Sequence, residues 1–221
     1  RFAPQRGARL GRYELVQKLG RGAMGEVWEA VQKPLDRSVA LKLLLPERMN
    51  GRSIDYFARE ARAAGKLSHP DIVPIFGAGV DGGTHWIAME LVPGGATLTN
   101  FLDDARGEGE LAGDYYPQAA ELMAKVADAL EVAHAAGVIH RDVKPRNVLL
   151  DGEGRPVLAD FGLAKLLDGE SLSRTGDFAG TYLYMSPEQA LSRRMGLDHR
   201  TDVFSLGACL YEALALRLPF E

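Results

Sequence analysis

This chain of 221 residues has almost no cysteine, no long apolar run and no marked excess of charge. Its single cysteine, Cys209, cannot form an internal disulfide, which favours a reducing compartment; its apolar helical surroundings predict a buried thiol. No run of about 18 apolar residues occurs, so the sequence predicts no membrane-spanning segment. The 26 basic and 30 acidic residues leave a formal net charge of −4, which argues against nucleic acid or an anionic membrane as the main partner.

The rest of the composition is that of a soluble globular protein. Hydrophobic residues make up 46% of the chain and charged residues 25%, and the length allows one large domain or two smaller lobes. Residues 1–12 are basic and lack an apolar segment, so we predict a flexible arm there and no secretory signal. Both ends of the sequence have the character of cuts within a longer protein.

A glycine-rich turn lies between two predicted strands. Alternation from Tyr13 predicts a strand with Leu15 and Leu19 on the same face, and Val27 to Val31 forms a second strand after the turn at 20–25. Its glycines allow backbone N–H groups to approach phosphate oxygens. A dinucleotide-binding turn would require a helix next, and a P-loop would require G-K-[ST]; the sequence has neither.

A lysine lies within the next apolar strand, Ser38 to Leu44. Lys42 stands between Leu41 and Leu43, where an ammonium needs a partner. Glu60, on a helix predicted from Ser53 to Ala64, is the candidate partner. An exposed pair of this kind contributes only about 0–1 kcal/mol, so we interpret it as a device that positions Lys42 on a phosphate.

Two further strands, Ile72 to Phe76 and His85 to Leu91, are predicted before Pro93-Gly94-Gly95 breaks the pattern. We interpret this break as a boundary between two lobes, with a ligand site at the boundary. His69, in the turn before these strands, is interpreted as structural. The acidic and glycine-rich residues 103–114 are predicted to form a solvated loop, and a strong helix is predicted over Pro117 to Ala136.

The segment His140–Asn147 reads H-R-D-V-K-P-R-N and brings together an acid, a base and an amide. These are Asp142, Lys144 and Asn147, and Asp160-Phe161-Gly162 follows after a predicted hairpin. That hairpin would hold Asn147 and Asp160 at matching ends of paired strands. Two converging oxygen ligands are typical of magnesium beside a phosphate site, and Asp142 could accept a proton from a hydroxyl.

The polar segment after Asp160 carries Ser171, Ser173 and Thr175. A phosphate on one of these hydroxyls could pair with Arg141. The last predicted helix opens with Asp202, whose simplest role is an N-cap. Its apolar residues are expected to face a core: Val203, Leu206, Leu210 and Leu214.

Taken together, these motifs resemble the serine/threonine protein kinases, above all the bacterial Hanks-type (eukaryotic-like) enzymes. The resemblance covers Tyr13 to Glu221 and is carried by L-G-R-G-A-M-G-E-V, F-A-R-E-A, H-P-D-I-V and G-T-Y-L-Y-M-S-P-E-Q-A, together with H-R-D and D-F-G. It implies an α+β, two-lobed fold, in which a small antiparallel sheet with one main helix (13–89) is joined by a hinge (90–95) to a mainly helical lobe (96–221).

The same resemblance implies a role for each matching residue. The family uses ATP with Mg2+ or Mn2+, and Asn147 and Asp160 would hold the metal. Asp142 would accept the proton of a substrate Ser or Thr hydroxyl, with Lys144, Lys42, Glu60 and Thr181 completing the catalytic set. The nucleotide would be bound by Leu19, Gly20, Arg21, Gly22, Ala23, Met24, Gly25, Glu26, Val27, Ala40, Lys42, Met89, Glu90, Val92 and Leu149. Ala64, Ile75, His140 and Phe161 would form a stack that links the lobes, and Asp202 would brace the catalytic loop.

Two departures from the family pattern stand out. Ser186 replaces the alanine of A-P-E, and the helical lobe is truncated, so that Glu188 would lack an arginine partner that a later helix supplies in the family. We expect a cytoplasmic kinase domain, with a membrane anchor conceivable beyond Glu221, protein substrates, autophosphorylation in the 171–175 segment and a kinase homodimer. The alternative is a nucleotide-binding scaffold without catalysis.

Overall fold

The computed structural model describes residues 2–22, 25–44, 59, 61–107, 110–161, 182–191 and 197–220. The chain divides into two compact units. Unit 1 comprises Arg1–Lys66 and Pro74–Leu91, and unit 2 comprises Leu67–Val73 and Val92–Glu221.

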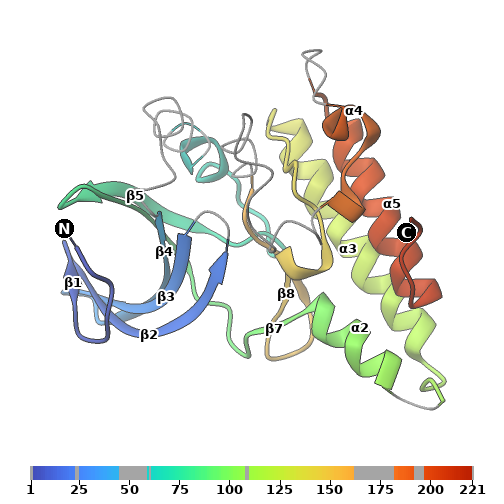
Figure 1. The fold of residues 1–221 in the computed structure, drawn as a ribbon, viewed down its shortest axis with the longest axis horizontal. Helices are drawn as coiled ribbons and strands as arrows, with labels where there is room; N and C mark the ends of the chain where they lie inside the picture. Colours follow the sequence, from blue (N-terminus) through green and yellow to red (C-terminus); the bar gives the residue numbers. More distant parts are fainter. Residues whose placement is uncertain are drawn as a thin grey trace. The chain divides into compact units, whose positions relative to one another are not determined.

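Unit 1 contains a six-stranded antiparallel sheet in the order β1-β2-β3-β4-β6-β5. Its strands are β1 (Arg9–Leu10), β2 (Tyr13–Gly22), β3 (Gly25–Gln32), β4 (Arg37–Leu44), β5 (Ile75–Asp81) and β6 (Thr84–Glu90). The sheet is strongly curled (Figure 1). The backbone N–H of Gly11, in the turn after β1, donates to the carboxylate of Asp81 at the end of β5, so the two edges of the sheet meet.

One face of this sheet packs into an apolar core. Tyr13 and Leu15 of β2 are buried, and the ring of Tyr13 meets that of Trp86 edge-on at 4.9 Å. Trp28 lies in the same cluster and is also buried. The remaining buried members are Leu10, Ala30, Val39, Leu41, Leu43 and Ala88.

Two expectations for unit 1 are wrong. The flexible arm predicted over residues 1–12 is instead tied to the sheet, because Arg9 and Leu10 pair with β2 and Leu10 is only 1% exposed. Leu19 does not share the buried face of Tyr13 and Leu15. The register of β2 against β3 shifts twice, between Leu15 and Gln17 and between Lys18 and Gly20, which breaks the period of two and leaves Leu19 exposed.

The strand boundaries before the lobe break also differ from the prediction. The strand expected to begin at Ile72 begins at Ile75, and Ile72 itself forms an isolated bridge with Leu158 within unit 2. Of the helix predicted from Ser53 to Ala64, only residue 59 and residues 61–64 are described, and these are helical. Gly65 follows them in a turn, as its N–H bonds to the carbonyl of Ala61.

Unit 2 is mainly helical. Its long helices α3 (Tyr115–Ala135) and α5 (Arg200–Ala215) lie side by side (Figure 1). The other elements are α2 (Leu98–Gly107), α4 (Pro187–Ala190), two 3₁₀ turns, η2 (Pro145–Asn147) and η5 (Tyr182–Tyr184), and a small antiparallel sheet of β7 (Ala96–Thr97), β8 (Val148–Leu150) and β9 (Pro156–Leu158). Across the described parts of both units, no helix is long and apolar enough to cross a bilayer.

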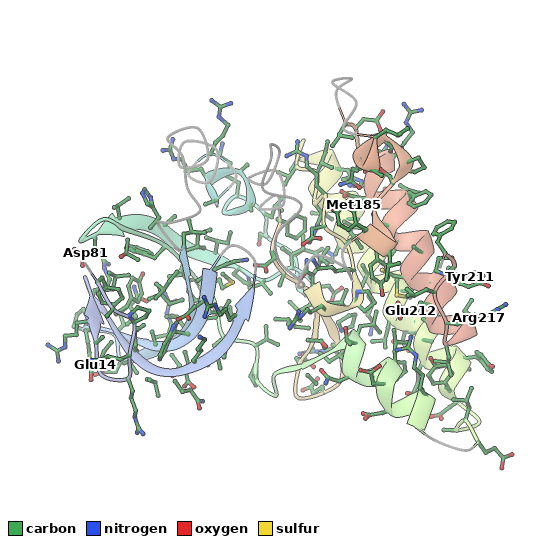
Figure 2. The ribbon with its side chains drawn as sticks, in the orientation of Figure 1. Glu14, Asp81, Met185, Tyr211, Glu212 and Arg217 are labelled. Carbon is green, nitrogen blue, oxygen red and sulfur yellow. The ribbon has the colours of Figure 1, made fainter. Side chains whose placement is uncertain are left out.

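A buried glutamate joins several elements of unit 2. Glu212 of α5 is 5% exposed, and its carboxylate accepts from Arg106 of α2 at 2.6 Å and from the hydroxyl of Tyr184 in η5. Arg106 also donates to the carbonyl of Leu216, which ends α5 in a left-handed conformation. Figure 2 shows the contrast with the neighbouring Tyr211, which points outward from α5.

Two expectations for unit 2 are wrong. Residues 103–107 are not a solvated loop but the second half of α2, whose Leu98, Leu102 and Ala105 are buried at helical spacing. The residues expected to face a core from α5 do not all do so, because Val203, Leu210 and Leu214 are exposed. The buried face of α5 instead carries small and polar residues: Thr201, Asp202, Ser205, Ala208, Cys209, Glu212 and Ala213. The buried Cys209 thiol was predicted correctly.

We predict opposite outcomes for alanine at two glycines of the turn. A Cβ on Gly25 would lie 1.8 Å from the carbonyl oxygen of Leu43, whereas a Cβ on Gly22 would meet nothing within 4 Å. Gly25→Ala should therefore lower the free energy of unfolding by at least about 2 kcal/mol, because backbone must move. Gly22→Ala should change it by less than about 1 kcal/mol. Urea unfolding of both variants tests this, and equal losses would contradict it.

Candidate active site

The predicted site residues are distributed over both units, and several lie outside the described part of the chain. Those outside are Ala23, Met24, Glu60, Thr181 and the segment with Ser171, Ser173 and Thr175. The residues predicted to bind the nucleotide lie mostly in unit 1. Asp142, Lys144, Asn147, Asp160, Val92 and Leu149 lie in unit 2. Each group is described within its own unit.

In unit 1, four predicted nucleotide-binding residues share one face of the sheet. Val27 pairs directly with Lys42, and Ala40 pairs with Met89. Directly paired residues of neighbouring strands point to the same side, as do residues two apart in one strand. These four therefore lie opposite the face that carries the apolar core. Lys42 itself is only 7% exposed.

The glycine turn is secured by a polar cluster at its base. Glu26 is buried, and it accepts from Lys18 Nζ at 2.5 Å and from Trp28 Nε1 at 3.0 Å. Burial alone would raise the pKa of Glu26, but the hydrogen bonds from Lys18 and Trp28 outweigh it and lower the pKa. The carboxylate stays ionised and ties β2 to β3 beside the turn. The turn residues of β2, Gly20, Arg21 and Gly22, are exposed.

The segment predicted to meet adenine passes from unit 1 to unit 2. The backbone N–H of Glu90 is bonded to the carbonyl of Pro74 at 2.9 Å, so a contact from Glu90 to adenine would use its carbonyl. Val92 is half-buried in unit 2. Leu149, also half-buried, sits in the middle of β8, paired with Thr97 on one side and Val157 on the other.

The carboxylate of Asp142 is the centre of a polar cluster in unit 2. Lys144 Nζ lies 2.9 Å from its Oδ1, and Asn147 Nδ2 lies 2.9 Å from its Oδ2. Asn147 Nδ2 also donates to the backbone carbonyl of Asp142 at 2.8 Å. The side chain of Asp142 is 17% exposed, which keeps it within reach of a ligand. The structure thus brings together the acid, base and amide that the sequence places within eight residues.

Asn147 and Asp160 lie at neighbouring ends of one hairpin. Val148 pairs with Leu158, and the N–H of Ala159 donates to the carbonyl of Asn147 at 2.9 Å. Because Asn147 Nδ2 is committed to Asp142, the amide is oriented with Oδ1 as its open ligand atom. An amide oxygen and a carboxylate are the hard ligands that Mg2+ prefers, so the donor set fits that ion.

His140 holds the loop on the N-terminal side of Asp142. Its Nε2 lies 2.8 Å from the carbonyl oxygen of Ala159, so Nε2 carries the proton, and Nδ1 accepts from the N–H of Asp142. Burial lowers the pKa of His140, which keeps the ring in this neutral form. The ring also packs on Phe161 at 4.5 Å. Of the predicted four-residue stack, only this pair lies in unit 2; Ala64 and Ile75 lie in unit 1, and the link between the lobes stays a prediction.

Asp202 collects three donors beneath the catalytic loop. It is fully buried, and it accepts from the N–H of His140 and the N–H of Arg141, each at 2.7 Å, and from His134 Nε2 at 2.7 Å. The N-cap role suggested by its position is wrong, because His199 occupies the N-cap of α5 and Asp202 lies in the first turn. The bracing role implied by the family resemblance is confirmed by these bonds.

The loop contains two residues in a conformation that side chains disfavour. Arg141 has φ of 65° and Asp160 has φ of 66°, and neither is glycine. Such a conformation costs on the order of 1–2 kcal/mol per residue and persists only where neighbouring groups fix it. For Arg141 those groups include Asp202 and Gln189, the latter of which sequence reasoning missed. The only sequence signal was the S-P-E-Q order, which is typical of a capping box.

Asp202→Ala should lower the free energy of unfolding by roughly 3 kcal/mol or more, because three buried donors lose a charged acceptor. Asp128→Ala, a change of the same type at an exposed position of α3, serves as the matched control and should shift stability by less than about 0.5 kcal/mol. Chemical denaturation of both variants measures the difference. Similar values for the two would contradict the bracing role.

Comparison with known proteins agrees with this geometry. The family profile described as "Protein kinase domain" matches residues 13–221. A probable serine/threonine-protein kinase of Clostridium perfringens is 40% identical over 95% of this chain and 30% of its own length. The serine/threonine-protein kinase PknA of Mycobacterium tuberculosis is 38% identical over 99% of this chain and 50% of its own length. The chain thus spans half or less of these relatives.

A solved structure shares the fold as well. The crystal structure of the Mycobacterium tuberculosis PknI kinase domain superposes with a TM-score of 0.78 at 30% identity, and the match covers all of this chain and 80% of that one. The family match extends over nearly the whole sequence, and it includes the strands, the loop and the hairpin that carry the site. The chain therefore belongs to the protein kinase domain family, among the bacterial Hanks-type serine/threonine kinases.

Proposed function

We propose that this chain is the catalytic domain of a protein kinase that transfers the γ-phosphoryl group of ATP to serine or threonine hydroxyls. The observation that carries the proposal is the cluster of Asp142, Lys144 and Asn147, in which one carboxylate holds both a lysine ammonium and an amide. The printed names of the relatives support the choice of serine and threonine as acceptors.

In this proposal the residues of unit 2 perform the chemistry. Asp142 orients the substrate hydroxyl and accepts its proton, and Lys144 neutralises charge on the transferred phosphoryl group. Asn147 and Asp160 hold Mg2+, which supplies electrostatic stabilisation of the phosphate oxygens when it is bound. Thr181, outside the described residues, completes this group. Phosphoryl transfer requires positioning more than covalent chemistry, which fits a loop in which each polar atom has a fixed partner.

The residues of unit 1 bind the nucleotide. Lys42 holds its phosphates with Glu60 as the positioning partner, the glycine turn covers them, and Val27, Ala40 and Met89 offer an apolar surface to the base. Their common face of the sheet supports this assignment. We propose the domain boundaries 13–89, 90–95 and 96–221 for the two lobes and their hinge. Autophosphorylation at Thr175 or Ser173, read by Arg141, is the proposed activating step.

Asp142→Asn should reduce phosphoryl transfer by about 10²–10³ or more, because the hydroxyl loses its proton acceptor. The measurement is incorporation of label from ATP with Mg2+ into a serine- or threonine-containing protein substrate, with the full-length protein. Asp128→Asn, exposed on α3, is the matched control and should keep wild-type activity. Equal label in wild type and Asp142→Asn would refute the enzymatic function and leave a nucleotide-binding scaffold.

Arg146 suggests a limit on substrate choice. It is exposed in η2, at a place where some kinases that select basic sequences carry glutamate. A cation there disfavours another cation nearby, so we expect no selection for arginine just before the target hydroxyl. A peptide array tests this, with Arg146→Glu as the comparison. Strong arginine selection at that position by the wild type would contradict the expectation.

A further inference from the structure

We propose that Gln189 of α4 is a positioning residue for the catalytic carboxylate, because it fixes the peptide group between Arg141 and Asp142. The inference rests on the proposed function of Asp142. Gln189 Nε2 donates to the backbone carbonyl of Arg141 at 2.8 Å, although the two residues lie 48 positions apart in the chain. This is a direct bond from α4 to the residue that precedes Asp142.

The bond completes the fixation of a single peptide plane. The carbonyl of Arg141 and the N–H of Asp142 belong to the same planar unit. Gln189 holds the oxygen at one end, and Nδ1 of His140 accepts the N–H at the other. A plane held at both ends cannot rotate, so the direction in which Asp142 leaves the backbone is set.

The need for such fixation follows from the backbone of Arg141. Its φ of 65° is unfavourable for a residue with a side chain, so the loop would relax toward another conformation without external partners. Asp202 fixes the N–H of Arg141 and Gln189 fixes its carbonyl. Removal of Gln189 would leave the strained residue held from one side only.

The amide of Gln189 is itself oriented by the start of α4. Its Oε1 accepts from the backbone N–H of Ser186 at 3.1 Å, which leaves Nε2 as the end that faces Arg141. A flipped amide would set two N–H groups against each other and two oxygens against each other. Ser186 caps the same helix, is fully buried and bonds to the hydroxyl of Thr201 at 2.6 Å. Thr201 precedes Asp202 in α5, so both holders of the Arg141 backbone rest on one helix.

This network gives α4 a part in setting the geometry of the site. The helix follows closely on η5, the turn after the predicted Thr181 segment. A shift of this segment would pull on the carbonyl of Arg141 through one side chain. It also assigns a purpose to Ser186, because the alanine of the family pattern has no hydroxyl to bond with Thr201 or to cap Gln189.

The test compares Gln189→Met with wild type in the full-length protein. Methionine keeps the length and apolar stem but lacks the donor. We expect kcat to fall about tenfold, the loss that one hydrogen bond of about 1.4 kcal/mol predicts. KM for ATP should stay within about twofold, and the stoichiometry of ATP binding should be unchanged, because the nucleotide residues are untouched. Gln118→Met, exposed on α3, is the matched control and should behave as wild type.

A second measurement does not depend on activity. Amide hydrogen exchange of a peptide spanning residues 138–143 should become about tenfold faster in Gln189→Met, because the loop opens more often. If this variant does not fold, Gln189→Glu replaces it, since a carboxylate keeps the acceptor for Ser186 and loses the donor for Arg141. Wild-type kcat and exchange in the folded variant would overturn the proposal. A fall in kcat that matches a loss of ATP-binding sites would overturn it too, as it would indicate a general folding role.

Failure of the two proposals can be distinguished. If Asp142→Asn is inactive while Gln189→Met matches wild type, the proposed function stands and the role of Gln189 is refuted. If Asp142→Asn is as active as wild type, the proposed function fails, and the positioning role fails with it, whatever the exchange data show.

Discussion

The structure of the catalytic loop depends on one buried carboxylate. Asp202 has no access to solvent, yet it accepts three hydrogen bonds, two of them from consecutive backbone N–H groups of His140 and Arg141. A buried charge is tolerated only when its partners are close and correctly aligned, so the helix that carries Asp202 and the loop above it have to form together. The unfavourable backbone of Arg141 is a consequence of this requirement, since only that conformation presents both N–H groups to one carboxylate.

The two units meet comparable demands by different means. In unit 1 the register of three strands places Val27, Ala40, Lys42 and Met89 on one face, so the site follows from sheet geometry alone. In unit 2 the equivalent residues lie on a loop without a regular pattern, and side chains such as His140, Asn147 and Asp202 take over the work of a hydrogen-bonded ladder. Sheets position residues through repetition, whereas this loop needs a separate partner for each backbone group.

The extent to which sequence predicted structure follows from this difference. The strands around the glycine turn, the hairpin that carries Asn147 and Asp160, and α3 were predicted because their signals are local periodicity and turn residues. The faces of β2 and α5 were not. Bulges in β2 moved Leu19 out of register, and α5 buries Ser205 and Glu212 in place of its leucines because hydrogen bonds, not apolar area, decide that face. Partners such as Arg106 and Gln189 lie far from their acceptors in the chain, so no local pattern could reveal them.

The position of the two tryptophans has a practical consequence. Trp28 and Trp86 are the only tryptophans in the sequence, and both pack in the core of unit 1. Intrinsic indole emission therefore reports on that sheet and is blind to the helical unit, whose aromatic signal comes from tyrosine and phenylalanine. Circular dichroism at the helical minimum, in contrast, is dominated by α2, α3 and α5. The two signals together offer a label-free way to see whether the halves of this domain melt as one.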